Sequence, residues 1–197
     1  MKNTYLVFDI ETRPLPLETI KAKGLMPSFK PPANIKDPEK IKAREAEHEA
    51  DVMEKAALDP LLSTVCAAGV IFGDGEMFEW LADRNCVGFQ DDERTRIQWI
   101  WNHIRHCLND QGRIVGFNTH GFDLPYLINR SWILDVPICE SVLKGKWWSE
   151  FSIDLADKWR VGRKDSYVSL DRLSRAMNVG QKSGNGKDFA ALLDTDF

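Results

Sequence analysis

Two acidic residues, Asp9 and Glu11, follow a short apolar segment at Tyr5–Phe8. The segment contains aromatic and β-branched residues, a composition typical of a buried strand. Successive side chains of a strand alternate between its two faces, so residues 9 and 11 are expected to point to the same side. Converging carboxylates can bind Mg²⁺, which proteins hold through a few carboxylates together with phosphate oxygens of a substrate. The pair is therefore a candidate metal site for phosphodiester chemistry.

The Asp-x-Glu spacing alone does not identify this site. With 18 Asp and 12 Glu in 197 residues, chance gives roughly one such pair, and the chain has four. The other three are Asp37/Glu39, Asp74/Glu76 and Asp91/Glu93. Two of these begin predicted helices, where acids interact favourably with the helix dipole, and the middle one lies in a predicted hairpin turn. For Asp9/Glu11, metal binding and an acidic turn after a strand are equally good interpretations from spacing and context.

A second group of polar residues lies in the segment Gly116–Arg130, where Asp123 follows a predicted strand and opens a predicted helix. Taken alone, Asp123 is more simply an acid that favours a helix N-terminus. Together with Phe8-Asp-Ile-Glu-Thr12, however, Asn118-x-x-x-Phe-Asp-x-Pro-Tyr-Leu127 resembles motifs of the DEDD (DnaQ-like) 3'-5' exonucleases. The resemblance is greatest to the exonuclease domain of family-B DNA polymerases and its predicted stand-alone relatives. Ser152–Leu155 and Ser169–Leu173 resemble the segments between motifs in those proteins.

The resemblance implies an α/β fold, an RNase H-like mixed five-stranded sheet flanked by helices. It also implies two Mg²⁺ or Mn²⁺ ions and the removal of nucleotides from single-stranded or frayed DNA ends, with RNA as an alternative substrate. In the family's arrangement Asp9 would bridge both ions, Glu11 would hold the ion that activates water, and Asp123 would hold the second ion. Carboxylates crowded in this way repel one another strongly unless cations bind.

The same resemblance assigns three residues to the substrate. Thr12 and its backbone lie where the family grips the terminal nucleotide. Asn118 and Phe122 would contact the strand, and Phe122 would do so by stacking on a base. These three residues are the expected substrate-binding residues.

The family's fourth carboxylate has no clear counterpart. It belongs to a third motif, Tyr-x-x-x-Asp or a His with an Asp five residues later, and none of the four histidines has that Asp. Tyr167/Asp171 has the tyrosine spacing, but Ser169 as an N-cap with Asp171 in the first turn of a helix is the favoured interpretation. The third motif would then fall beyond Phe197, with a C-terminus incomplete relative to the family. A catalytically impaired nucleic-acid-binding module is the alternative function.

Two further polar residues carry alternative interpretations. His120 is a candidate ligand because it lies close to Asp123, although a surface histidine explains it better. Asp154 suits a helix N-cap and equally suits a residue that supports the metal site from behind its ligands.

The elements expected around these residues form a strand, an inserted arm, a hairpin and then alternating helices and strands. The predicted arm covers about residues 15–60 and contains a charged helix at 38–58, whose weak apolar stripe suits a surface element and which is a candidate site for a protein partner. The remaining strands are expected at 61–72, 76–81 and 113–117, and the helices at 91–108, 121–133, 153–160 and 170–177. This order predicts a single α/β domain over residues 1–197 with a mixed sheet.

Composition limits the classes of function. The net charge of −4 excludes a strongly basic nucleic-acid coat, so contact with DNA would need a local patch. The four cysteines are scattered, which argues against a zinc knuckle or a disulfide framework and favours a reducing compartment. With neither a signal peptide nor an apolar stretch of 18 residues, we expect a cytoplasmic protein without membrane contact.

One tract of the chain is locally basic. Val142–Lys187 holds 10 Lys and Arg against 5 Asp and Glu, and it contains Trp147 and Trp148. Such a tract can follow a phosphate backbone while the tryptophans stack on bases. A solvated surface with core tryptophans is an equally good interpretation.

Overall fold

The computed structural model describes residues 4–73, 78–81, 92–143, 150–163 and 167–181. It divides into two compact units. The sheet unit comprises residues 1–11 and 65–197, and the arm unit comprises residues 12–64. The arm unit therefore occupies nearly the same residues as the inserted arm expected from the sequence.

The sheet contains five strands in the order β3-β2-β1-β4-β5. The strands are β1 (Tyr5–Pro14), β2 (Ser63–Gly73), β3 (Phe78–Leu81), β4 (Arg113–Gly116) and β5 (Ser152–Asp154). β4 lies parallel to β1, with Val7 opposite Val115, and parallel to β5, with Val115 opposite Ile153. β2 and β3 are antiparallel. The sheet is therefore mixed, and three strands that are far apart in the sequence lie side by side.

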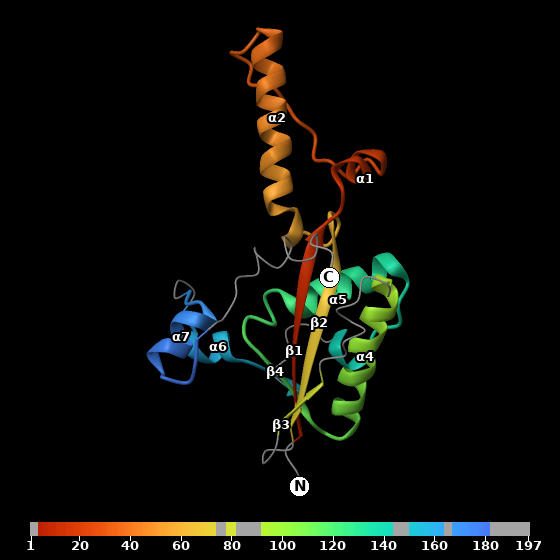
Figure 1. Cartoon of the computed structure of the whole chain (residues 1–197), viewed down its shortest axis with the longest axis vertical. Coiled ribbons are helices and arrows are strands. Elements are labelled where there is room, and N and C mark those ends of the chain that lie inside the picture. The colour runs from red at the N-terminus through yellow and green to blue at the C-terminus, as the bar shows by residue number, and fades with distance from the viewer. Residues whose placement is uncertain (1–3, 74–77, 82–91, 144–149, 164–166, 182–197) are drawn as a thin grey trace, which may run out of the picture. The chain divides into compact units, whose positions relative to one another are not determined.

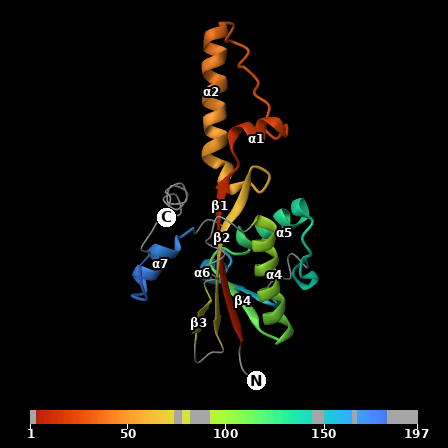
Figure 2. The ribbon, with the colours of Figure 1, turned by 45° about the vertical axis from the view of Figure 1, so that its right-hand side comes forward.

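The helices α4 (Glu93–Asn109) and α5 (Asp123–Leu134) lie together on one side of the strands (Figures 1 and 2). The apolar face of α4 is fully buried and includes Ile97, Ile100, Trp101 and Ile104. The side chains of β1 alternate, so that Leu6, Phe8 and Ile10 join this core. Since burial selects every second residue of β1, the residues between them face the other side of the strand.

The arm unit contains α1 (Leu17–Ala22), α2 (Pro38–Lys55) and the 3-10 helix η1 (Ala56–Leu58). Its own small core consists of Ile20, Ala56 and Leu62. α2 begins where the sequence predicts, because the Asp37 side chain accepts a hydrogen bond from the Glu39 N–H and Pro38 occupies the first turn. None of the residues of α2 is buried. The weak apolar stripe of the predicted helix at 38–58 therefore indicated a surface helix correctly.

The expected helix at 153–160 is wrong at its start. Ser152–Asp154 forms the edge strand β5, and helix α6 covers only Leu155–Arg160. The strand has three residues, too few to show an alternating pattern in the sequence. The helix α7 (Leu170–Ala176) lies where it was expected. Part of the predicted strand at 76–81 lies outside the described residues.

Candidate functional site

The middle of β1 presents the first two candidate ligands. Asp9 and Glu11 occupy alternate positions on the face of β1 opposite Phe8 and Ile10. Asp9 is exposed and Glu11 is half-buried. The strand therefore displays two carboxylates on one side, as the sequence predicts for an i, i+2 pair.

The third candidate ligand, Asp123, approaches β1 from the neighbouring strand. β4 ends at Gly116, and Asp123 begins α5 a few residues later. Because β4 pairs with β1 in parallel, with Val7 opposite Val115, the carboxyl end of β4 lies beside the middle of β1. Hydrogen bonding to its own backbone N–H and to that of Ile10 acts to lower the pKa of the Asp123 carboxyl. The start of α5 therefore lies near the middle of β1.

The electrostatics of Asp123 reflect this setting. Its side chain is buried, with 6% of the residue exposed. The pKa of Asp123 is raised from 3.8 to about 7. Burial is the largest cause of this rise, and the negative charge of Asp9 is the next. Asp9 and Asp123 therefore lie close enough to repel each other. A cation between them would relieve the repulsion, and oxygen donors of this kind fit Mg²⁺ or Mn²⁺.

The loop between β4 and α5 has a constrained backbone. A Cβ atom on Gly116 would lie 1.7 Å from the Thr119 hydroxyl, so a residue without a side chain is needed there. Asn118 has a φ of 61°, in the left-handed region. Phe122 packs partly against the core and contacts Tyr126, with ring centroids 5.3 Å apart. We call residues 118–122 the β4–α5 loop. It contains Asn118 and Phe122 and directly precedes Asp123 in the sequence.

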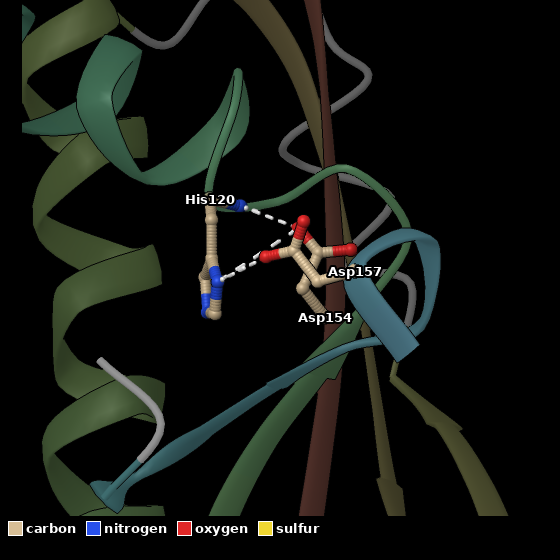
Figure 3. A group of neighbouring side chains, drawn as sticks. All are labelled: His120, Asp154 and Asp157. Carbon is tan, nitrogen blue, oxygen red and sulfur yellow. Dashed lines mark hydrogen bonds and ion pairs between the residues drawn. The ribbon is translucent and has the colours of Figure 1, made fainter. Parts of the chain in front are cut away.

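A group of three side chains lies beside this loop (Figure 3). The Asp154 carboxylate, with 1% of its side chain exposed, accepts hydrogen bonds from three backbone N–H groups. The donors are Asn118 at 2.9 Å, His120 at 2.9 Å and Ala156 at 2.8 Å. The His120 ring contacts Asp157 through Nδ1 at 3.1 Å and Ser152 through Nε2 at 3.0 Å. Asp154 is thus the N-cap of α6 and also contacts the β4–α5 loop.

The group of His120, Asp154 and Asp157 could also hold a metal ion, because one ligand atom from each lies within 4.8 Å of the others. In the structure these atoms already have hydrogen-bond partners, and both Asp154 oxygens accept backbone N–H groups. An ion would have to compete with these contacts. Hydrogen bonding therefore explains the geometry of this group without a metal.

Three of the residues singled out in the sequence have hydrogen-bond partners within their own unit of the structure. Asp171 lies in the first turn of α7 and its Oδ2 is 2.9 Å from Nε of Arg175. The Ser169 hydroxyl accepts a hydrogen bond from the Arg172 N–H, as the capping interpretation predicts. The Thr12 hydroxyl donates to the Ala57 carbonyl at 2.6 Å within the arm unit. Asp171 therefore serves helix α7 in the way its sequence context indicates.

The basic tract is only partly described. Trp147 and Trp148 lie outside the described residues, as do five of its lysines, Lys144, Lys146, Lys164, Lys182 and Lys187. In the part that is described, Arg160 contacts Asp157 at 3.3 Å, and Arg175 contacts Asp171. These ion pairs offset part of the local positive charge.

Comparison with known proteins shows the fold. No protein-family model and no curated protein sequence matches the chain. Among solved structures, the family B DNA polymerase from the hyperthermophilic archaeon Pyrobaculum calidifontis is similar, with a TM-score of 0.54 and 20% sequence identity. The similarity covers 98% of this chain and 21% of the polymerase chain. The chain thus has a fold found within a family B DNA polymerase and spans about a fifth of that protein's length. Over the described residues, no helix has both the length and the apolar character that crossing a membrane requires.

Proposed function

We propose that this protein is a metal-dependent 3'-5' exonuclease that removes nucleotides from single-stranded or frayed DNA ends. The observation that carries the proposal is the approach of Asp9 and the buried Asp123. Two carboxylates held in mutual repulsion favour a bound cation. The fold shared with a DNA polymerase supports a nucleic acid as the substrate.

The proposed roles are those that the sequence motifs suggest. Asp9, Glu11 and Asp123 would hold two Mg²⁺ or Mn²⁺ ions. Such ions, when bound, supply the charge that activates a water molecule and stabilises the leaving 3'-oxygen. Asn118 and Phe122 would orient the strand, Phe122 through a base stacked on its ring. Thr12 stays a prediction of the sequence motif for contact with the terminal nucleotide.

A nucleic-acid-binding module without turnover is the second candidate function. It is favoured by the ion pair that Asp171 makes with Arg175, because this contact ties the candidate fourth carboxylate to its own helix. With three carboxylates, the ion that activates water would lack one protein ligand. Both functions share the fold and the substrate class, and they differ in whether the bound strand is cleaved.

The test is a cleavage assay on single-stranded DNA. The strand is labelled at its 5' end in one sample and at its 3' end in another, and each is incubated with Mn²⁺, Mg²⁺ or EDTA. An exonuclease gives a ladder that shortens from the 3' end and releases labelled mononucleotide from the 3'-labelled strand, only when metal is present. A strand that is bound but stays intact in folded protein would support the binding module instead. A matched RNA strand decides between the two nucleic acids.

A further inference from the structure

We infer that Asp154 is a positioning residue that holds the β4–α5 loop, and with it Asn118 and Phe122, in the orientation needed to bind the substrate strand. The inference rests on the proposed function, because that function assigns Asn118 and Phe122 to the substrate. The connection between Asp154 and the loop is itself independent of that assignment.

The first observation is the number of loop contacts made by one buried side chain. The two oxygens of Asp154 accept the backbone N–H groups of Asn118 and His120, both at 2.9 Å. These residues lie 36 and 34 positions away in the sequence. A buried carboxylate is costly unless hydrogen bonds satisfy it, and bonds from N–H groups to a charged oxygen are stronger than neutral ones. Asp154 and the loop therefore stabilise each other.

The second observation is the backbone of the loop. Asn118 adopts a left-handed conformation, which carries a cost for a residue with a side chain. The backbone N–H groups of a tight loop must find acceptors, since an unpaired buried donor is costly. Asp154 accepts the N–H groups of residues 118 and 120, which lie on either side of the buried Thr119. The carboxylate thus selects one conformation of the loop.

The third observation is that the His120 side chain holds the loop to the same two elements. Its Nδ1 contacts Asp157 of α6 (Figure 3), and its Nε2 contacts Ser152 of β5. Both the backbone and the side chain of His120 are therefore attached to the β5–α6 segment. Residues 152–157 therefore support the loop, and Asp154 and Ser152 are buried polar members of this segment.

The role of Asp154 in the loop must be separated from its role as the N-cap of α6. The Asp154→Ser variant does this, because a serine hydroxyl is a good N-cap that can accept the Ala156 N–H but is too short to serve the loop. Asp157→Asn is the matched control, since it lies on the same helix and contacts His120 but accepts no backbone N–H of the loop among the described contacts.

We expect three results from Asp154→Ser. Hydrogen exchange becomes faster in the peptide that covers residues 116–123. The KM for a single-stranded oligonucleotide rises by about tenfold, the lower end of what loss of a residue supporting a site costs. The kcat at saturating DNA and the affinity for Mn²⁺ stay close to wild type. Asp157→Asn should not show this rise in KM at unchanged kcat. A merely structural residue would instead lower the fraction of active protein, and so reduce kcat and leave KM unchanged.

Unchanged loop exchange and unchanged KM in folded Asp154→Ser would overturn the inference. So would loss of Mn²⁺ affinity in both variants, because the group around His120 would then be a metal site. If Asp154→Ser does not fold, amide exchange of the wild-type protein decides. Protection of the Asn118 and His120 amides at the level of the core supports the inference, and exchange at the rate of open loops overturns it. If the wild-type protein cuts no strand, the proposed function fails, while the exchange measurements still report on Asp154 and the loop.

Discussion

The raised pKa of Asp123 makes the stability of the metal-free protein depend on pH in an unusual direction. The folded state favours the protonated carboxyl, because ionisation is opposed by burial and by the charge of Asp9. Between the ordinary pKa of 3.8 and the folded value of about 7, the unfolded chain binds fewer protons at this group than the folded chain does. The contribution of Asp123 to stability is therefore greatest in acid and is lost as the pH rises through about 7.

The magnitude follows from the two pKa values. A rise from 3.8 to about 7 corresponds to about 4 kcal/mol, at about 1.4 kcal/mol for each pH unit. Asp123→Asn removes the ionisation while keeping an oxygen that can accept the Ile10 N–H. Part of the gain is lost because the amide group is itself buried, so we expect the variant to be more stable than wild type by about 2 kcal/mol at pH 8 in EDTA. At pH 4 the ionisation gain is nearly absent while the cost of burying the amide remains, so the variant should be less stable than wild type by about 1–2 kcal/mol.

Urea unfolding at pH 4 and pH 8 measures this difference directly, in EDTA and again with Mn²⁺. Mn²⁺ should stabilise the wild-type protein at pH 8 and should have little effect on Asp123→Asn, since a ligand is lost. Asp110→Asn is the matched control, because Asp110 is exposed. This replacement should leave the unfolding free energy unchanged at both pH values, in EDTA and with Mn²⁺. A variant that is less stable than wild type at pH 8 in EDTA would refute the reasoning.

Three further predictions concern stability. Val161 ends α6 with a φ of 49° and is 81% exposed. The Val161→Gly variant should be more stable than wild type by about 1 kcal/mol, because glycine adopts this left-handed conformation without strain, and Val161→Ala should not be more stable. Urea midpoints compare the three proteins, and a destabilised glycine variant would show that the side chain makes a needed contact. Gly116→Ala should cost about 3 kcal/mol, because the added Cβ meets the Thr119 hydroxyl at 1.7 Å; a melting temperature equal to wild type would contradict this. Glu93→Ala should cost about 3–5 kcal/mol, because it leaves the buried Arg130 without the carboxylate that its Nε contacts at 2.8 Å. A loss below 1 kcal/mol in urea unfolding would mean that the guanidinium finds another partner.

The type of the long elements was predictable from local patterns, although β1 runs to Pro14 and the apolar segment that predicts it ends at Phe8. β1 and α4 have clear apolar periodicity, and the N-caps of α2 and α7 are the residues that the sequence indicates. The short elements β5 and α1 were missed for a physical reason. β5 has three residues and α1 has six, which are too few to show a periodic pattern of apolar residues.

The candidate site divides in the same way. Asp9 and Asp123 were found through their motifs, and the structure brings them together because β1 and β4 are adjacent and parallel. The contacts of Asp154 with the β4–α5 loop had no local signal, since its partners lie more than thirty residues away. Glu93 likewise looked like a helix-start acid, whereas its carboxylate binds Arg130, 37 residues along the chain. Side-chain contacts of this length follow from tertiary packing rather than from spacing.

The most direct test of the account compares two Asp-x-Glu pairs of the same chain in the cleavage assay. One protein carries Asp9→Asn with Glu11→Gln, and the control carries Asp37→Asn with Glu39→Gln at the start of the surface helix α2. Both variants remove two negative charges, and asparagine keeps the N-cap of α2. We predict that the first variant loses Mn²⁺-dependent shortening of 5'-labelled DNA by at least about 100-fold while the control retains it. Shortening at the wild-type rate by the Asp9→Asn, Glu11→Gln protein would contradict the assignment of the metal site to these two residues of β1.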